Sequence, residues 1–251
     1  MKTKKISTEI FLWTFLVWTL SFLCYLPMLL DKNGVHIPKA AYSLKYLFVV
    51  MPLAVSVLFA LKQKCLKDFC SGLFAEKINF RSIFICVILG CTGLLFSYIY
   101  AIVSDKTDLF LYSYPSVAAV AVNCSYLFVT AFAEEIAWRG FLLNKIISAN
   151  GKKTAFIYVG FVWAVWHIPM WAIRNSLRFN EIIIYFIYTV IISFILGMIF
   201  CAYKNIFTVS FAHMLINTCY IAPVKYNIVL LGCILILLIF FFRKRIGAFG
   251  K

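Results

Sequence analysis

The sequence contains a series of apolar runs, and most are long enough to cross a lipid bilayer as a helix. A helix rises about 1.5 Å per residue, so about 20 apolar residues span the hydrocarbon core of a membrane. The runs predict an all-α membrane protein with about eight transmembrane helices, of which the fourth is long for one crossing and the seventh is short. They cover residues 10–30, 41–61, 82–104, 116–143, 154–173, 181–203, 206–221 and 226–242.

The composition leads to the same class of protein. Apolar residues make up 64% of the chain and charged residues 13%, whereas soluble domains have about 45–50% apolar and about 25% charged residues. A soluble globule could not cover its surface with so few charges, and a disordered or collagen-like chain would be far less apolar. We therefore expect an integral multi-pass protein, and residues 1–251 form a single polytopic membrane domain because no repeat or linker interrupts them.

The formal net charge of +15 is distributed unevenly between the loops. With a cytoplasmic N-terminus and eight crossings, 16 Lys and Arg residues fall on the cytoplasmic side and 6 on the outside. This asymmetry follows the positive-inside rule, so both termini are predicted to be cytoplasmic. The basic charge thus indicates a lipid bilayer as partner and no nucleic acid. The mixed segment 63–81 is expected to form a short helix on the membrane surface.

Two acidic residues, two histidines and one arginine lie inside apolar runs. Glu134 and Glu135 are adjacent in the fourth run, which also contains Arg139, whereas the other seven acids lie in loops or at the ends of runs. His167 lies in the fifth run and His213 in the seventh. Polar groups at membrane depth are costly, so each of these side chains is a candidate functional residue.

Helical spacing separates the roles of these residues. Glu135 and Arg139 are four residues apart with the acid first, which is the favourable order for an ion pair on one helix face. Glu134 points about 100° away and lacks this partner. The pair is therefore expected to hold the fourth run rigid and to orient Glu134. His213 and Asn217 are also four residues apart and share one face of the seventh run.

If these faces converge, they form a hydrolytic site within the membrane. A carboxylate, Glu134, and an imidazole, His167, can together activate a water molecule. A second imidazole, His213, and the carboxamide of Asn217 can donate hydrogen bonds to the oxyanion that forms at an attacked carbonyl. Pro169 interrupts helical hydrogen bonding beside His167, and the resulting kink would open space for water or a substrate backbone.

These residues resemble the motifs of the CPBP family of intramembrane endopeptidases. That family includes the type II CAAX prenyl endopeptidases and many bacterial bacteriocin-processing, self-immunity and abortive-infection proteins. The resemblance covers about residues 129–219, within a motif-bearing core of about residues 116–221. The motifs are EExxxR at 134–139, FxxxH at 163–167 with Trp163 in place of phenylalanine, and HxxxN at 213–217.

The resemblance implies an eight-helix intramembrane protease that cleaves a membrane-associated or lipid-anchored peptide or protein in a bacterial cell membrane. It implies that Glu134 and His167 activate water, that His213 and Asn217 stabilise the oxyanion, and that the neighbouring acid and arginine are supporting residues. The tryptophan at position 163 exchanges one aromatic side chain for another, so we expect it to alter the shape of the pocket rather than the chemistry. The oligomeric state and the need for a prenyl group stay open.

Other interpretations of the same residues exist. Glu134, His167 and His213 would suit a zinc site of the His₂Glu type. We favour a site without cofactor or metal, because Asn217 is a poor zinc ligand and a good oxyanion donor. A catalytically silent immunity or scaffold protein and a proton-coupled transporter with a Glu134–His167 relay are further alternatives. No HExxH, GxGD or GxSxG motif points to another type of intramembrane protease.

Overall fold

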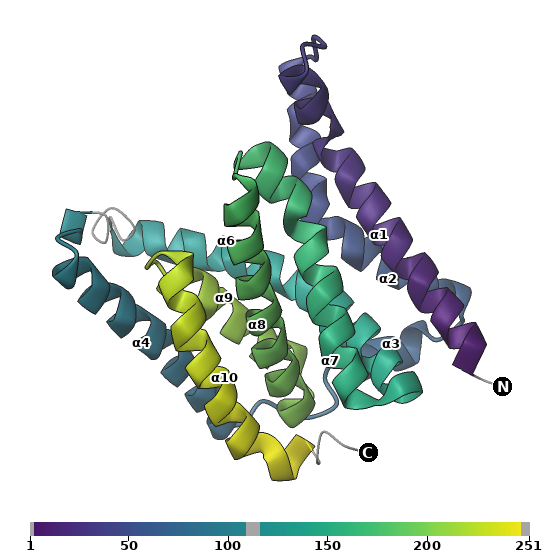
Figure 1. Ribbon diagram of the computed structural model, residues 1–251. Coiled ribbons are helices and arrows are strands. Elements are labelled where there is room, and N and C mark those ends of the chain that lie inside the picture. The colour runs from purple at the N-terminus through teal and green to yellow at the C-terminus, as the bar shows by residue number, and fades with distance from the viewer. Residues whose placement is uncertain (1–2, 109–115, 247–251) are drawn as a thin grey trace.

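The computed structural model describes residues 3–108 and 116–246, with side chains from Thr8 to Phe242 outside the gap. Within these ranges the regular structure is helical (Figure 1). A single antiparallel bridge between Phe74 and Asn205 is the one strand-like pairing among the described residues. The predicted all-α fold is therefore confirmed.

The first half of the chain follows the first three apolar runs. The predicted short helix in segment 63–81 is also present, as α3. The elements are α1 (Thr3–Lys32), a 3₁₀ segment η1 (Lys39–Val50) that leads into α2 (Met51–Lys62), α3 (Leu66–Gly72) and α4 (Phe80–Val103).

The fourth and fifth runs form one long helical path that changes direction at Gly151. Gly151 has φ +79°, a left-handed value that glycine adopts without the steric cost of a Cβ. It separates the two predicted runs where the sequence places a polar loop. The elements of this path are α6 (Val117–Glu135), the wider π-helix η2 (Ile136–Leu143), α7 (Asn144–Pro169) and a second π-helix η3 (Met170–Arg174).

The last three runs form α8 (Phe179–Tyr203), α9 (Ile206–Cys219) and α10 (Val224–Ile246). Among the described residues, six helical segments are long and apolar enough to cross a membrane, and one of them, Val117–Arg174, contains both the fourth and the fifth predicted run. The chain is thus an integral multi-pass membrane protein. The seventh predicted run differs: α9 has 14 residues, about 21 Å of helix, which is shorter than the bilayer core.

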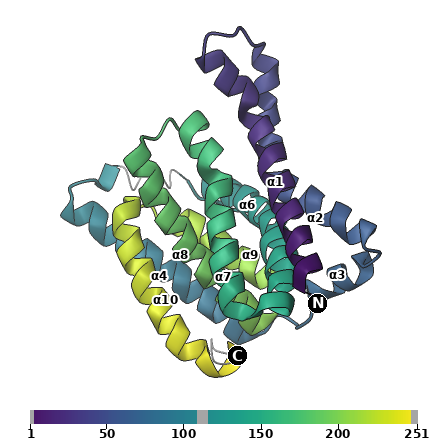
Figure 2. The same ribbon diagram turned by 45° about the vertical axis from the view of Figure 1, so that its right-hand side comes forward.

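The short helix α9 is surrounded by longer helices. It packs against α4, α6 and α8, and α8 also packs against α7 and α10. Figures 1 and 2 show that α6, α7, α8 and α9 approach one another in the middle of the molecule. The helices that carry the three motifs pack together there. The motif residues therefore lie near one another in space, although their segments are far apart in the sequence.

Candidate active site

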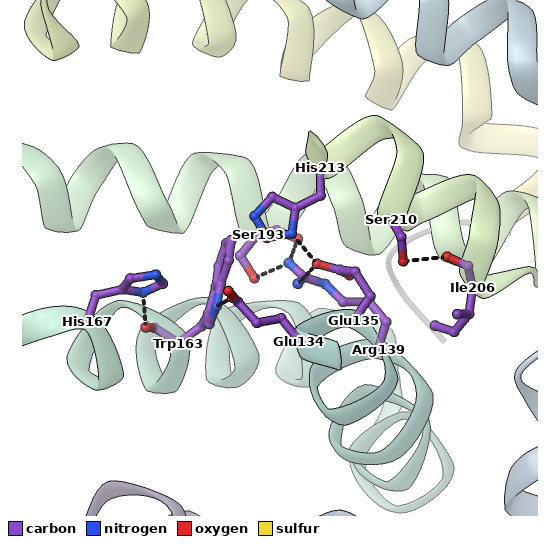
Figure 3. A network of polar contacts seen from close by, with 9 residues as sticks. All are labelled: Glu134, Glu135, Arg139, Trp163, His167, Ser193, Ile206, Ser210 and His213. Atoms are coloured by element: carbon purple, nitrogen blue, oxygen red, sulfur yellow. Dashed lines mark hydrogen bonds and ion pairs between the residues drawn. The ribbon is translucent and has the colours of Figure 1, made fainter. Parts of the chain in front are cut away.

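Polar side chains from five elements meet in the interior between α6, η2, α7, α8 and α9 (Figure 3). Most of these side chains are buried, although the surrounding helices are apolar. Buried polar groups are stable only where they are paired or hydrogen-bonded. The cluster consists of Glu134, Glu135, Arg139, Trp163, His167, Ser193 and His213.

Glu135 and Arg139 form the ion pair that their spacing predicts. Arg139 Nη1 donates to Glu135 Oε1 at 2.7 Å, and both side chains are fully buried. Arg139 Nη2 donates to the backbone oxygen of Ser193 at 3.3 Å and to its Oγ at 3.1 Å. The guanidinium therefore ties the start of η2 to the middle of α8.

Glu135 also holds the histidine of the third motif. Its Oε1 lies 2.8 Å from His213 Nδ1, so the same carboxylate oxygen contacts both the guanidinium and the imidazole. That the Glu135–Arg139 pair orients Glu134 stays a prediction. The structure adds a contact of Glu135 with His213 on α9, a different direction from that of Glu134, since adjacent residues on a helix point about 100° apart.

Glu134 is held by Trp163. The indole Nε1 of Trp163 donates to Glu134 Oε2 at 2.9 Å, and both side chains are buried. At position 163 the sequence predicts a changed pocket shape rather than changed chemistry. The structure shows in addition that the indole N–H reaches the carboxylate, a hydrogen bond for which phenylalanine has no donor. Tryptophan replaces the phenylalanine of the FxxxH motif at position 163. Its ring nitrogen is a hydrogen-bond donor, and this was the signal in the sequence that could have identified the contact.

His167 is fixed by its own helix. Its Nδ1 lies 2.9 Å from the backbone oxygen of Trp163. A carbonyl oxygen only accepts hydrogen bonds, so Nδ1 carries the proton and Nε2 retains its lone pair in the neutral ring. The His167 ring stacks on Trp171 with centroids 5.3 Å apart and meets Trp166 edge-on at 4.7 Å. This partly buried ring therefore has a defined orientation.

His213 and Asn217 extend the site along α9. The rings of His213 and Trp163 meet edge to face with centroids 5.3 Å apart. Asn217, one turn further along α9, is exposed, and its side chain makes no hydrogen bond with the described residues. The structure thus gathers Glu134, Glu135, Arg139 and His213 in one cluster and connects His167 to it through Trp163, whereas Asn217 is exposed one turn beyond His213.

Pro169 adjoins a cavity, although its backbone keeps helical angles. A space of about 390 Å³ lies between α1 and the junction of α7 with η3, and its lining includes Val165, Ile168 and Pro169. A larger cavity of about 830 Å³ lies between α4, α8 and α10. Neither lining includes Glu134 or His213, so both cavities are separate from the buried part of the cluster.

The residues proposed for zinc do not converge on a common point. In the ranges that the structure describes, no three His, Cys, Asp or Glu side chains are grouped so that they could hold a metal ion. The Nδ1 atoms of His167 and His213 already face the Trp163 carbonyl and the Glu135 carboxylate. Glu134, His167 and His213 are thus not grouped as a zinc site among the described residues, and a site without cofactor or metal stays a prediction.

Comparisons with known proteins agree with the motifs. The family model for type II CAAX prenyl endopeptidase Rce1-like proteins matches residues 116–219, which contain all three motifs. CAAX prenyl protease 2 of Methanococcus maripaludis is 27% identical over 154 residues, which cover 56% of this chain and 56% of that protein. The match thus spans little more than half the length of this relative. These matches support the predicted resemblance to the CPBP family: residues 116–219, within the motif-bearing core, are similar to Rce1-like type II CAAX prenyl endopeptidases.

Proposed function

We propose that this protein is an intramembrane endopeptidase that hydrolyses a peptide bond in a membrane-associated or lipid-anchored peptide. The observation that carries the proposal is a buried carboxylate, Glu134, and two imidazoles, His167 and His213, grouped around Trp163 between the packed helices. The family match and the relative that is named as a prenyl protease support this activity and add a lipid-modified peptide as a candidate substrate.

Glu134 and His167 are the groups that activate water in this proposal. The Glu134 carboxylate accepts a proton from the water as the water oxygen bonds to the substrate carbonyl carbon, while the lone pair on His167 Nε2 accepts a hydrogen bond from the other O–H of that water. The carbon–nitrogen bond then breaks, and the proton passes to the leaving nitrogen. Both groups are held by Trp163, at its indole nitrogen and its carbonyl oxygen, which limits the orientations open to each of them.

His213 and Asn217 stabilise the oxyanion. The carboxylate of Glu135 accepts from His213 Nδ1, so His213 Nε2 can donate only when the ring is a cation. A protonated His213 and Arg139 also balance the charges of the two buried acids, which lowers the cost of burying them. Asn217, at the exposed end of the site, supplies a neutral amide donor where a substrate carbonyl would enter.

Purified protein in detergent provides the test. The substrates are a farnesylated peptide with a C-terminal CAAX sequence and the same peptide without the farnesyl group, and products are identified by mass spectrometry. Removing a general base or an oxyanion donor costs about 10²- to 10⁴-fold in rate, so Glu134→Gln and His213→Ala should cleave at least about 100-fold more slowly. Glu181→Gln is the matched control, since Glu181 caps α8 away from the site.

The outcomes distinguish the alternatives. If Glu134→Gln and His213→Ala cleave as fast as the unaltered chain, the catalytic assignment is wrong. If the unaltered chain cleaves neither peptide, and Glu134→Gln still complements a deletion in cells, a silent immunity or scaffold protein is favoured. A chelator such as phenanthroline should leave the cleavage rate unchanged, and a loss of activity that zinc restores would establish the metal-dependent version.

A further inference from the structure

Trp163 contacts each of the ionisable side chains that the proposed reaction uses. Its ring lies below the Arg139 guanidinium, with the guanidinium carbon 4.7 Å from the ring centroid. The His167 and His213 rings meet it edge-on, with centroids at 5.2 Å and 5.3 Å. Its Nε1 donates to Glu134 Oε2. A side chain that is only 2% exposed is therefore the common neighbour of the acid and both imidazoles (Figure 3).

The hydrogen bond to Glu134 differs from those of the other paired buried tryptophans. Trp13 and Trp166 donate to the hydroxyl groups of Ser56 and Ser21, at 3.2 Å and 2.8 Å. Those acceptors are neutral and connect transmembrane helices. Trp163 donates to an ionisable oxygen, and hydrogen bonds to charged acceptors are about twice as strong as neutral ones.

We propose that Trp163 is a positioning residue that fixes the orientation of both water-activating groups, Glu134 and His167. The indole N–H fixes the Glu134 carboxylate, and the carbonyl oxygen of the same residue fixes the tautomer of His167. The inference rests on the proposed function, because it assigns a role within that reaction. It gives the indole nitrogen of this chain a task that the phenylalanine of the FxxxH motif cannot perform.

Replacing the indole N–H without changing the fold tests the proposal. Trp163→Phe keeps an aromatic ring and the carbonyl oxygen but removes the donor. We expect kcat to fall about 10- to 100-fold, the range that corresponds to losing one hydrogen bond to a charged group, while KM changes by less than about threefold. Incorporating 3-benzothienylalanine at position 163 keeps the bicyclic shape without the N–H, and it should reproduce the loss in kcat.

A matched control separates positioning from folding. Trp13→Phe removes a comparable buried indole hydrogen bond on α1, and it should change thermal stability while kcat stays within about twofold. The infrared band of Glu134, assigned by its disappearance in Glu134→Gln, should shift in Trp163→Phe and stay in place in Trp13→Phe.

Two failures are distinguishable in this experiment. If the unaltered chain cleaves its peptide and both replacements at position 163 keep full kcat, the positioning role is overturned while the proposed function stands. If the unaltered chain cleaves nothing, the proposed function fails, and the positioning role fails with it. An unchanged Glu134 band in Trp163→Phe would also overturn the inference, whatever the activity.

Discussion

At the scale of single residues, Arg139 has the least freedom to change. Its guanidinium is fully buried and satisfied by Glu135, by Ser193 and by the ring of Trp163, while its Nε has no partner among the described residues. A charge in such a place is stable only while its counter-charge remains. Glu135 is that counter-charge, and it also holds His213.

Glu135→Gln should therefore cost stability and activity together. Breaking a buried ion pair by removing one partner costs about 3–5 kcal/mol, because the remaining charge is left unpaired. The free energy of unfolding in detergent should fall by about this amount, and kcat should fall because His213 loses its anchor. The double variant Glu135→Gln with Arg139→Met should be less destabilised than the sum of the single variants. Additive losses would show that the pair is not coupled.

The sequence could predict contacts within one helix but not those between helices. The four-residue spacing of Glu135 and Arg139 predicts their ion pair, and the structure contains it. The bonds from Glu135 to His213 and from Trp163 to Glu134 join residues 78 and 29 positions apart. They depend on how α6, α7 and α9 pack, and periodicity within one run carries no information about that packing.

At the scale of helices, α4 supports the C-terminal end of α9. Glycines on α4 let α9 approach closely: a Cβ on Gly93 would lie 2.2 Å from the ring of Tyr220, and one on Gly90 would lie 3.2 Å from Leu215. Small residues allow such close approach between membrane helices. Ser97 then donates to the Cys219 carbonyl at 2.9 Å. The end of α9 that carries Asn217 is thus fixed by a small-residue face.

Gly93→Ala should displace this end of α9. Tyr220 must move, and its hydroxyl would lose the 3.0 Å bond to the Leu89 carbonyl, so we expect a loss of about 1–3 kcal/mol in unfolding free energy. Gly232→Ala is the control, since nothing lies within 4 Å of an added Cβ there. It should be neutral or stabilise the protein by up to about 1 kcal/mol. Equal stabilities of the two variants would contradict the close packing of α4 on α9.

The helices themselves were largely predictable, but their irregular turns were not. Each apolar run of the sequence forms a helix, because a backbone in lipid must satisfy its own hydrogen bonds. The π-helices η2 and η3 follow directly after Glu135 and Pro169. Such wide turns often occur at functional sites. The π-helix η2 carries Arg139 and η3 carries Trp171, which stacks on His167, and hydropathy does not predict either wide turn.

At the scale of the whole molecule, the described ends of the chain are consistent with an even number of crossings. The start of α1 and the end of α10 lie toward the same end of the molecule in Figures 1 and 2, together with α3. The turn between η3 and α8 lies at the opposite end. The charge asymmetry predicts that the first end faces the cytoplasm. Of the charges counted, Lys2 and Lys251 lie outside the described residues.

Cysteine labelling in sealed cells tests this orientation. Cys70 on α3 is exposed and is predicted to face the cytoplasm, whereas Asn175, also exposed, follows η3 on the predicted outer side. In a chain whose other cysteines are replaced, Asn175→Cys should react with a membrane-impermeant maleimide in intact cells, and Cys70 should react only after lysis. The bilayer blocks the reagent, so the difference reports topology rather than local exposure. Labelling of Cys70 in intact cells would invert the predicted orientation, and the exposed Asn217 end of the site would then face the cytoplasmic leaflet.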